Sequence, residues 1–448
     1  MLDHVVDTTC FAPLWLQWHR TYFNYKRRVI LVDADSDTSW TPHALHEEID
    51  KFLKLLPMLE NGARIAFSLP NGAQWVALFL ALQKLRMIAI PLDAGLPEKA
   101  CFELAHQLNC QALYYRGKFH ALTAAKVAMR NFCCIKLTSG TSGGLPNQVP
   151  CLATHLLADG TNIIQTMGIR PADRNLASIP LGHSYGLGNF IMPLILQGTC
   201  LVCAGRFVPD QLATWMREYK ITIFPSVPSL FRILAIMPGQ RSLTPLRLAI
   251  SAGAPLTPEV ARSFFKRYKI KIHNFYGSSE TGGICYDRSG NATLSGRSVG
   301  KPLTGVTVTI KDHRIVVTSP AVAKRMGRWR VPDRGEWNDK GELVLLGRHG
   351  RAVNLEGKKV HPSEVENVLR TTPGVSDAIV WAATDSERNY LHAAVETRLT
   401  LGDIQRALSA RLPEWKFPKR YLILAEFPRN ARGKVNVAAL RRSREAKT

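Results

Sequence analysis

The sequence lacks an uninterrupted apolar run long enough to cross a membrane. The best candidate is WVALFLALQKLRMIAIPL (75–92), and Lys84 and Arg86 break its apolar character. The N-terminal residues also lack the basic segment followed by an apolar core that defines a secretory signal peptide. Internal repeats and low-complexity linkers are absent as well. We therefore expect a cytoplasmic, globular protein without an integral membrane segment.

Cysteine is scarce and scattered. The chain has nine cysteines among 448 residues, and only Cys133 and Cys134 are adjacent. The spacing of the cysteines and histidines does not suggest a metal site. Because disulfide frameworks are typical of short secreted chains, reduced thiols in a cytosolic protein fit this pattern better.

Acidic residues are few relative to basic ones. The chain has 58 Lys and Arg against 35 Asp and Glu, a formal charge of +23, and the segment Leu401–Thr448 contains 12 basic and 4 acidic residues. Such an excess favours anionic partners, which include nucleic acid, a membrane surface, nucleotides and an acidic protein. It is equally compatible with a role in solubility alone. No recognised nucleic-acid-binding motif accompanies the charge, so we expect no nucleic-acid partner.

The sequence does contain an alternation of short apolar strands and helices. The helix after residue 256 has clear start signals, with Thr257 as N-cap, Pro258 in the first turn and Glu259 near the positive helix end. This alternation predicts an α/β fold with mostly parallel, doubly wound sheets. In such sheets ligands bind at the carboxyl ends of the strands. The strands expected in the middle of the chain are Asn175–Leu181, Ile221–Val227, Leu246–Ala252 and Ile270–Tyr276.

The C-terminal residues have a different pattern, which predicts a small, separate α+β domain. The expected domains are a large one, 1–347, and a small one, 348–448, with a boundary at RHGR (348–351) after the strand ELVLLG. HPSEVENVLRTTPG (361–374) predicts a helix with Ser363 as its cap. The other expected elements are the strands 375–384, 390–398 and 421–428 and the helix 401–412.

A Ser, Thr and Gly-rich segment, KLTSGTSGGLPNQV (136–149), follows an apolar run and resembles a phosphate-binding loop. It lacks the Gly-Lys-Ser/Thr ending of a Walker A loop, and alone it is equally typical of an ordinary turn. Further motifs follow in a fixed order. They are IPLGHSYGLG (179–188), SAGAPL (251–256), NFYGSSETGG (274–283), VPDRGEW (331–337), ELVLLGRHGR (342–351) and FPRNARGKV (427–435).

Together these motifs resemble the adenylate-forming superfamily, which includes acyl- and aryl-CoA synthetases, peptide-synthetase adenylation domains and luciferases. The resemblance covers nearly the whole chain and implies an active site between a large N-terminal and a small C-terminal domain. It implies two half-reactions. A carboxylate attacks the α-phosphate of ATP to give an acyl-adenylate and pyrophosphate, and a thiol then displaces AMP. The implied cofactors are ATP, Mg2+ and coenzyme A, or the phosphopantetheine of a carrier protein.

In the resemblance, the first loop embraces the β- and γ-phosphates through backbone N–H groups and hydroxyls. Most members have a Pro-Lys pair at its end, whereas this chain has Pro146-Asn147, so a clamping charge is missing. We expect this departure to affect rate or affinity rather than to abolish activity. The loop residues implied in nucleotide binding are Thr138, Ser139, Gly140, Thr141, Ser142 and Gly143.

The resemblance also assigns the rest of the nucleotide site. Tyr276 would stack on the adenine, Gly277 would permit a tight turn, and Glu280 would hold Mg2+, which prefers oxygen ligands. Asp333 would accept both ribose hydroxyls, although Val331-Pro332 replaces the usual Thr-Gly before it. The remaining implied positions are Gly253, Ala254 and Pro255 through their backbone, Asn274, Ser279 beside the α-phosphate, and Arg348 beside the ribose.

The catalytic assignments rest on the same resemblance. Lys434 matches the family's catalytic lysine, whose ammonium bridges the acid and the α-phosphate in the transition state. His183 resembles the gate beside the α-phosphate, although a lone histidine is often structural. Arg351 occupies the hinge, where Asp or Lys is usual, and Gly357 would line the pantetheine tunnel.

The acid and the thiol are less defined. GHSYGLGN (182–189) lacks the aspartate that pairs with an amino-acid substrate's amine, and the adjoining segments are apolar, which favours a fatty or aryl carboxylic acid. Coenzyme A is the family's commonest thiol, and the basic charge also suits an acidic acyl carrier protein. A function of another class stays open, namely a degenerate, non-catalytic nucleotide-binding protein, which Asn147, the Val331-Pro332 change and Arg351 would support.

Overall fold

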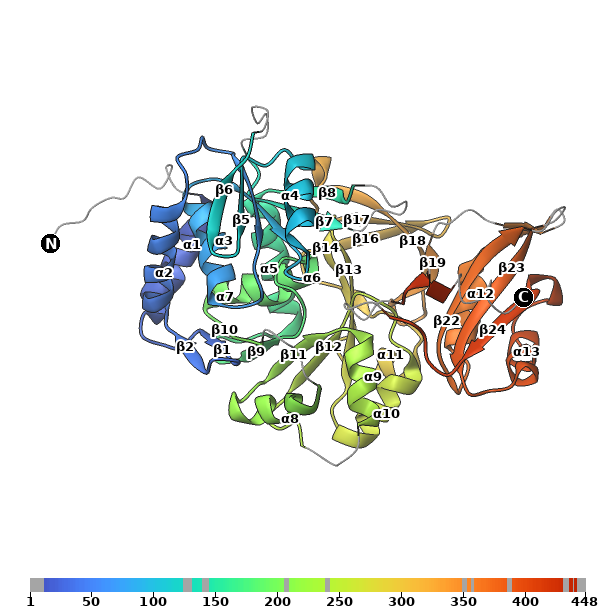
Figure 1. The fold of residues 1–448 in the computed structure, drawn as a ribbon. Helices are drawn as coiled ribbons and strands as arrows, with labels where there is room; N and C mark the ends of the chain where they lie inside the picture. Colours follow the sequence, from blue (N-terminus) through green and yellow to red (C-terminus); the bar gives the residue numbers. More distant parts are fainter. Residues whose placement is uncertain are drawn as a thin grey trace.

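The computed structural model shows two unequal parts of the chain. The larger part carries a nine-stranded, a six-stranded and a four-stranded sheet, and the C-terminal part, orange to red in Figure 1, lies to one side of it. The domain boundary at 348–351 stays a prediction. The structure describes residues 12–123, 131–138, 145–204, 209–237, 242–348, 353–355, 358–384, 389–429, 435–437 and 439–440.

The central sheet has the strand order β15-β14-β13-β12-β11-β9-β10-β1-β2. Its six strands from β13 to β1 run parallel, while β14, β15 and β2 pair antiparallel at the two edges. All four strands expected in the middle of the chain are present, as β9, β11, β12 and β13. The strands are β1 (Leu31–Asp33), β2 (Thr38–Trp40), β9 (Arg174–Ala177), β10 (Cys200–Cys203), β11 (Ile223–Ser226), β12 (Leu248–Ser251), β13 (Ile272–Ser278), β14 (Gly282–Tyr286) and β15 (Lys301–Pro302).

The six-stranded sheet has the order β6-β5-β3-β4-β7-β8, with four parallel strands flanked by antiparallel β6 and β8. Its strands are β3 (Arg64–Ser68), β4 (Ile88–Leu92), β5 (Ala112–Tyr115), β6 (Lys118–Ala121), β7 (Cys134–Thr138) and β8 (Asn147–Cys151). The four-stranded antiparallel sheet consists of β16 (Thr307–Lys311), β17 (Arg314–Thr318), β18 (Arg328–Trp337) and β19 (Leu343–Arg348).

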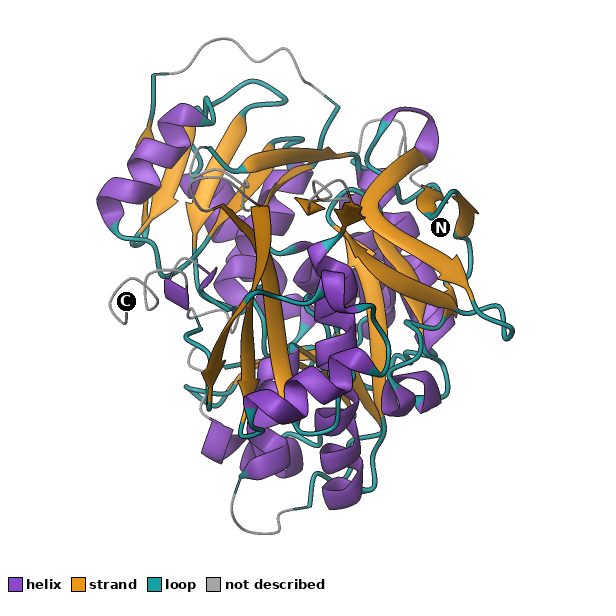
Figure 2. Ribbon diagram, turned by 90° about the vertical axis from the view of Figure 1, so that its right-hand side faces the viewer, coloured by secondary structure: helices purple, strands orange, loops and turns teal. Residues whose placement is uncertain are grey.

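Helices pack between and beside the sheets (Figure 2). One core cluster joins Phe67 of β3, Val76 of α3 and Leu201 of β10, so the two large sheets bury a common set of helices. The confirmed fold class is therefore a doubly wound α/β fold. These helices are α1 (Pro13–Tyr25), α2 (Pro42–Leu55), α3 (Ala73–Lys84), α4 (Glu98–Gln107), α5 (Ala153–Met167), α6 (Ser184–Gly186), α7 (Met192–Gln197), α8 (Pro209–Glu218), α9 (Pro228–Ile236), α10 (Pro258–Tyr268) and α11 (Asn291–Ser295).

The apolar run at 75–92 is an interior helix followed by a strand. Residues 75–83 of α3 are all buried between the sheets, which explains why the helix is apolar on every side. Among the residues described, every helix is too short or too polar to cross a bilayer. The cytoplasmic location stays a prediction.

The C-terminal part has its own sheet and core. The strands β22, β23 and β24 form the sheet, and α12 and α13 pack with it around Val365, Val395 and Leu408, which are fully buried. All the elements expected from the sequence are present. They are β20 (Val353–Leu355), β21 (Lys358–Val360), α12 (Pro362–Arg370), β22 (Val375–Thr384), β23 (Asn389–Thr397), α13 (Leu401–Ser409) and β24 (Arg420–Leu424).

One capping prediction was wrong, that for Ser363, whereas Thr257 is the N-cap residue of α10 as predicted. Helix α12 begins at Pro362 with His361 as its N-cap, so Ser363 lies inside the first turn. With Ser363 as N-cap the helix would begin at Glu364, whereas the fixed φ of Pro362 lets it begin two residues earlier. Helix α10 begins at Pro258 as predicted, but Thr257 makes no side-chain capping bond, and its hydroxyl is buried without a partner in the described structure.

The cysteines of the described residues are free and buried. Cys200 and Cys203 form a Cys-x-x-Cys sequence within β10. Because alternate residues of a strand point to opposite faces, side chains three apart cannot hold one metal ion. Burial raises the pKa of both thiols, which makes them poor nucleophiles.

Candidate active site

The loop after β12 presents backbone to its surroundings. Gly253, Ala254 and Pro255 are exposed, and Gly253 has a φ of 85°. A Cβ there would have room, since its nearest neighbour would be Val227 Cγ1 at 3.8 Å. The left-handed backbone, rather than crowding, therefore favours glycine. Asn274 lies beside this loop, because it pairs with the last residue of β12.

Glu280 lies in the tight turn between β13 and β14. The hydroxyls of Ser278 and Thr281 are 3.0 Å apart, and the Glu280 carbonyl accepts a 2.7 Å bond from the Ala323 amide. A Cβ on Gly277 would lie 2.5 Å from the carbonyl oxygen of Gly282, so only glycine permits this approach of the two strands. The turn therefore holds the predicted Mg2+ residue in a defined position.

Tyr276 and Asp333 meet across two sheets. The Tyr276 hydroxyl on β13 donates a 2.6 Å hydrogen bond to Asp333 Oδ2 on β18, although 57 positions separate them in the sequence. The backbone of Arg348 lies opposite Asp333 in the β18–β19 pair. A carboxylate has several acceptor sites, so the residue type suits a diol. The structure thus brings the predicted adenine and ribose residues together.

His183 is the N-cap residue of the short helix α6 and is half-buried. The next residues fix its position. The Tyr185 hydroxyl donates a 3.0 Å bond to the Ile250 carbonyl on β12, and a Cβ on Gly186 would overlap the Pro180 carbonyl. The predicted gate residue is therefore anchored beside the strand that leads into the Gly253 loop.

Lys136, which sequence reasoning did not assign, connects these segments. It lies on β7, is 4% exposed, and donates from Nζ to Ser184 Oγ at 3.1 Å and to the Ser279 carbonyl at 3.2 Å. Burial lowers the pKa of its ammonium, but Cys151 and Asp159 outweigh this effect and the net shift is upward. Its one sequence signal is a single cation inside an apolar strand.

The residues present fit Mg2+ only with help from a ligand. In the described segments, no group of three or more His, Cys, Asp and Glu residues could hold a metal ion. The Glu280 carboxylate is half-buried, and no described residue forms a hydrogen bond or ion pair with it. A single carboxylate completed by phosphate oxygens and water is a typical Mg2+ arrangement.

Several predicted site residues lie outside the described residues. Thr138 is described as the end of β7, opposite Asn147 on β8. Arg429 and Val435, which flank Lys434 in the sequence, form an isolated antiparallel bridge. The residues outside the description are Ser139, Gly140, Thr141, Ser142, Gly143, Arg351, Gly357 and Lys434.

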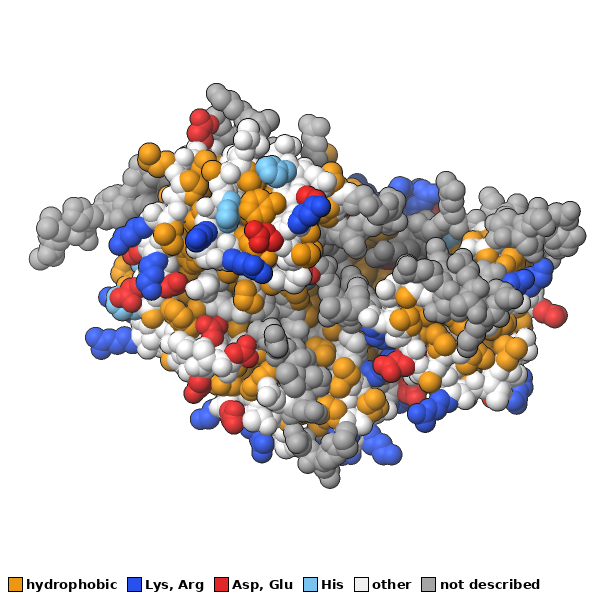
Figure 3. All heavy atoms as spheres, in the orientation of Figure 1, with side chains coloured by type: hydrophobic (Ala, Val, Ile, Leu, Met, Phe, Trp, Pro, Cys, Tyr) orange, Lys and Arg blue, Asp and Glu red, His pale blue; other side chains and the backbone are white. Residues whose placement is uncertain are grey.

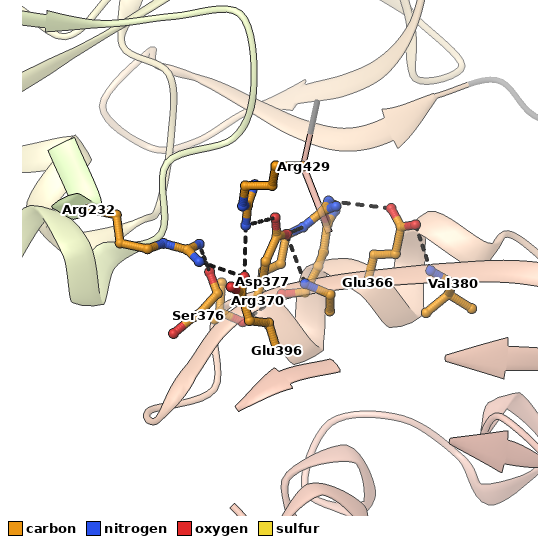
Figure 4. A network of polar contacts seen from close by, with 11 residues as sticks. Arg232, Glu366, Arg370, Ser376, Asp377, Val380, Glu396 and Arg429 are labelled. Atoms are coloured by element: carbon orange, nitrogen blue, oxygen red, sulfur yellow. Dashed lines mark hydrogen bonds and ion pairs between the residues drawn. The ribbon is translucent and has the colours of Figure 1, made fainter. Parts of the chain in front are cut away.

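A charged network joins the two parts of the molecule (Figure 4). Arg232 of α9 contacts Glu396 of β23 at 2.6 Å through Nη1, and its Nη2 donates to the Ser376 carbonyl at 3.0 Å. Arg429 contacts the same Glu396 oxygen at 2.8 Å. Glu396 is only 2% exposed at its side chain, so one buried carboxylate is shared by an arginine from each part.

The basic excess does not gather in one block on the face shown in Figure 3. Lys and Arg side chains are scattered over both parts, with Asp and Glu side chains among them. The coloured side chains, which belong to the described residues, do not form a continuous basic stripe of the kind that tracks a nucleic-acid backbone.

Comparison with known proteins shows similarity along most of the chain. At residues 18–128 and 115–324 it matches the family model described as AMP-binding enzyme, and at 364–434 the AMP-binding enzyme C-terminal domain. It is 25% identical to the oxalate–CoA ligase of Saccharomyces cerevisiae and 27% identical to the indoleacetate–CoA ligase of Aromatoleum aromaticum, in each case over 66% of this chain. These matches span only 60% and 64% of the relatives' own lengths.

A third relative is the 3,4-dihydroxybenzoate–[aryl-carrier protein] ligase of Bacillus anthracis, 23% identical over 87% of this chain and 92% of that protein. Among solved structures, the ATP-bound MatB of Rhodopseudomonas palustris superposes with a TM-score of 0.81 at 19% identity, over 96% of this chain and 98% of that chain. An anthranilate CoA ligase in complex with anthranoyl-AMP gives a TM-score of 0.82 at 18% identity, over 97% of both chains. Because the family model matches most of its length, the chain belongs to the family of AMP-binding enzymes, the adenylate-forming superfamily that its motifs indicated.

Proposed function

We propose that the protein is an acid–thiol ligase that activates a carboxylic acid with ATP. In the first step a carboxylate oxygen forms a bond to the α-phosphorus and the bond to the β-phosphate oxygen breaks, which releases pyrophosphate. In the second step a thiolate sulfur forms a bond to the acyl carbon, and the bond from that carbon to the phosphate oxygen of the mixed anhydride breaks, which releases AMP. The CoA and carrier-protein ligases among the relatives support this reaction class.

The observation that carries the proposal is the 2.6 Å bond between Tyr276 and Asp333. It joins an aromatic ring and a carboxylate at the end of the central sheet, which is where ligands bind in such folds. We assign the ring to the adenine and the carboxylate to the ribose. The Gly253 loop, the Glu280 turn and His183 lie on the neighbouring strand ends.

The chain's other residues take the remaining roles in this proposal. Glu280 would hold Mg2+, which supplies charge neutralisation at the phosphate oxygens when bound. His183 would lie beside the α-phosphate, and Lys434 would stabilise the charge that builds on the transferring group. The loop from Thr138 to Gly143 would hold the β- and γ-phosphates through N–H groups and hydroxyls.

We propose a fatty or aryl acid as substrate. The apolar segments 186–194, 224–230 and 250–254 lie together, because the Tyr185 hydroxyl is 3.0 Å from the Ile250 carbonyl and 3.5 Å from the Ser226 carbonyl. Leu187 and Phe190 in the first of these segments are buried. A largely apolar pocket suits an apolar acid.

Coenzyme A is the first candidate for the thiol, and the phosphopantetheine of an acyl carrier protein is the second. The second is supported by the carrier-protein ligase among the relatives and by the formal charge of +23, since carrier proteins of acidic surface would be attracted to it.

Pyrophosphate exchange with a panel of fatty, aryl and amino acids tests the first step. Mass spectrometry of the products with coenzyme A and with carrier protein then identifies the thiol. We expect ATP-dependent exchange with at least one apolar acid. Exchange with none of the acids, despite nucleotide binding, would instead support a non-catalytic nucleotide-binding protein.

A further inference from the structure

Lys136 is a buried cation in a place where a lysine is costly. It is the third residue of β7 and, by the alternation of a strand, its side chain shares a face with Thr138. It is 4% exposed. Lysine is almost never buried to this degree without a partner, because a desolvated ammonium is strongly disfavoured. A specific role is therefore needed to explain it.

The groups that contact the Lys136 ammonium directly are neutral, namely two oxygens and the Cys151 thiol. Nζ lies 3.1 Å from Ser184 Oγ and 3.2 Å from the Ser279 carbonyl. The nearby buried carboxylate of Asp159 forms no ion pair with it in the described structure, and its Oδ1 instead accepts a 2.8 Å bond from the Gly283 amide. The positive charge thus has no anion in direct contact, and the Asp159 carboxylate acts on it only from beyond ion-pair distance, where it still helps to raise the pKa of the ammonium.

Both contacts lead to residues of the candidate site. Ser184 follows the predicted gate residue His183, and Ser279 precedes the predicted Mg2+ residue Glu280. They lie 48 and 143 positions from Lys136 in the sequence. One ammonium therefore ties together the two segments that flank the expected position of the α-phosphate.

The hairpin that carries the phosphate loop has no other cation. Lys136 is the sole Lys or Arg in residues 131–151. The uncharged Asn147 on β8 lies opposite Thr138, two residues along β7 from Lys136. Any positive charge that this hairpin brings to a polyphosphate must therefore come from the strand rather than from the loop.

We propose that Lys136 is a positioning residue for the ATP phosphates, which fixes Ser184 and Ser279 by hydrogen bonds and contributes its positive charge to the binding of the anion between them. The inference rests on the proposed function in that the anion is a nucleotide phosphate. The inference explains how a chain with Asn147, in place of the usual lysine, at the end of the phosphate loop supplies a positive charge to the phosphates.

The test is nucleotide binding to the full chain, measured by calorimetry with MgATP and with uncharged adenosine. Lys136→Gln retains N–H donors for Ser184 and Ser279 but removes the charge, and Lys136→Met removes both. We expect the Kd for MgATP to rise about tenfold in both variants, with adenosine binding nearly unchanged. Lys51→Met, which removes an exposed lysine on α2, is the matched control and should alter neither ligand.

A second substitution distinguishes an effect of the lost charge from an effect on the local structure. Adding Asn147→Lys to Lys136→Gln should restore most of the MgATP affinity, because the cation returns to the same hairpin. If Lys136→Gln binds MgATP as tightly as the original chain, or loses adenosine and MgATP equally, the inference is wrong while the proposed function stands. If the original chain binds neither nucleotide, the proposed function fails and the inference with it.

Discussion

The large and small parts of the molecule are stabilised internally by apolar cores but joined to each other partly by charge. In the large part, two sheets share helices and a common core, as Phe67 and Leu201 show. The small part has a separate core around Val365 and Val395. None of the buried apolar clusters in the described residues spans both parts.

This difference indicates which part can move. Separating two sheets with a shared core would expose apolar surface, which is costly. Breaking the Arg232–Glu396 contact exposes polar groups that water can solvate. We propose that the candidate nucleotide site at Tyr276, Asp333 and Glu280 is fixed, and that the small part swings as a body.

The largest effect is expected from a substitution at Lys434, which changes the small part and leaves the proposed nucleotide site of the large part intact. Lys434→Ala should lower adenylate formation about 10²–10³-fold, because a positioned cation acts on charge that develops in the transition state. MgATP affinity and thioester formation from supplied acyl-adenylate should be nearly unchanged. Pyrophosphate exchange and product mass spectrometry measure the two steps separately.

Arg406→Ala is a suitable control for this experiment, since it removes an exposed cation of α13 that pairs with Asp403. It should alter neither step. Equal losses of both steps in Lys434→Ala would refute the assigned role of Lys434.

The next effect concerns the buried carboxylate that both parts share. Glu396→Gln should lower the free energy of unfolding of the small part by about 3 kcal/mol, because two arginines would lose their buried anion. Glu366→Gln is the matched control. Its side chain is 19% exposed, and among the described residues it pairs with Arg370 and accepts a 2.8 Å bond from the Val380 amide, which Gln could still satisfy, so a loss of about 1 kcal/mol is expected. Thermal unfolding of the full chain and hydrogen exchange in β23 measure the loss in each variant. If Glu396→Gln has the same free energy of unfolding as the original chain, the buried charge is not needed for stability.

A smaller effect isolates the contact between the parts. Arg232→Ala leaves Glu396 with Arg429 and with the Phe427 amide at 3.2 Å, so the small part should stay folded. We expect faster hydrogen exchange around Ser376 and α9, with a cost in stability of about 1 kcal/mol. Arg370→Ala should instead speed hydrogen exchange inside the small part and leave exchange in α9 unchanged, because Arg370 contacts Asp377 and Glu366 within the small part. Equal exchange patterns in the two variants would contradict a distinct interface.

The sequence predicted local features of both parts well. The strand Val375–Thr384 has the predicted bounds, and α10 begins at Pro258, since apolar alternation and proline act over a few residues. The family motifs indicated Tyr276 and Asp333, and the structure joins their side chains. That bond itself, like the Arg232–Glu396 pair, links distant positions that no local pattern relates.

Lys136 shows why part of the site was missed. A single lysine in an apolar strand is a weak local signal, and its meaning comes from contacts 48 and 143 positions away. The cap at Ser363 failed for the opposite reason. Two neighbouring helix-start signals competed, and the proline at 362 took precedence over the serine.

The smallest effect is expected from a substitution that compares a cation on strand β7 with a cation at the end of the phosphate loop, both in the large part. Asn147→Lys should lower the KM for MgATP by about threefold at most, or leave it unchanged, because Lys136 already supplies a cation to the hairpin and a second one adds little in a solvated loop. Gln148→Lys is the matched control. The neighbouring residue of β8 points to the other face, so a lysine there should leave the KM unchanged. A marked rise in KM with Asn147→Lys would show that position 147 does not face the phosphates. It would then also contradict the idea that Lys136 replaces a charge missing at position 147.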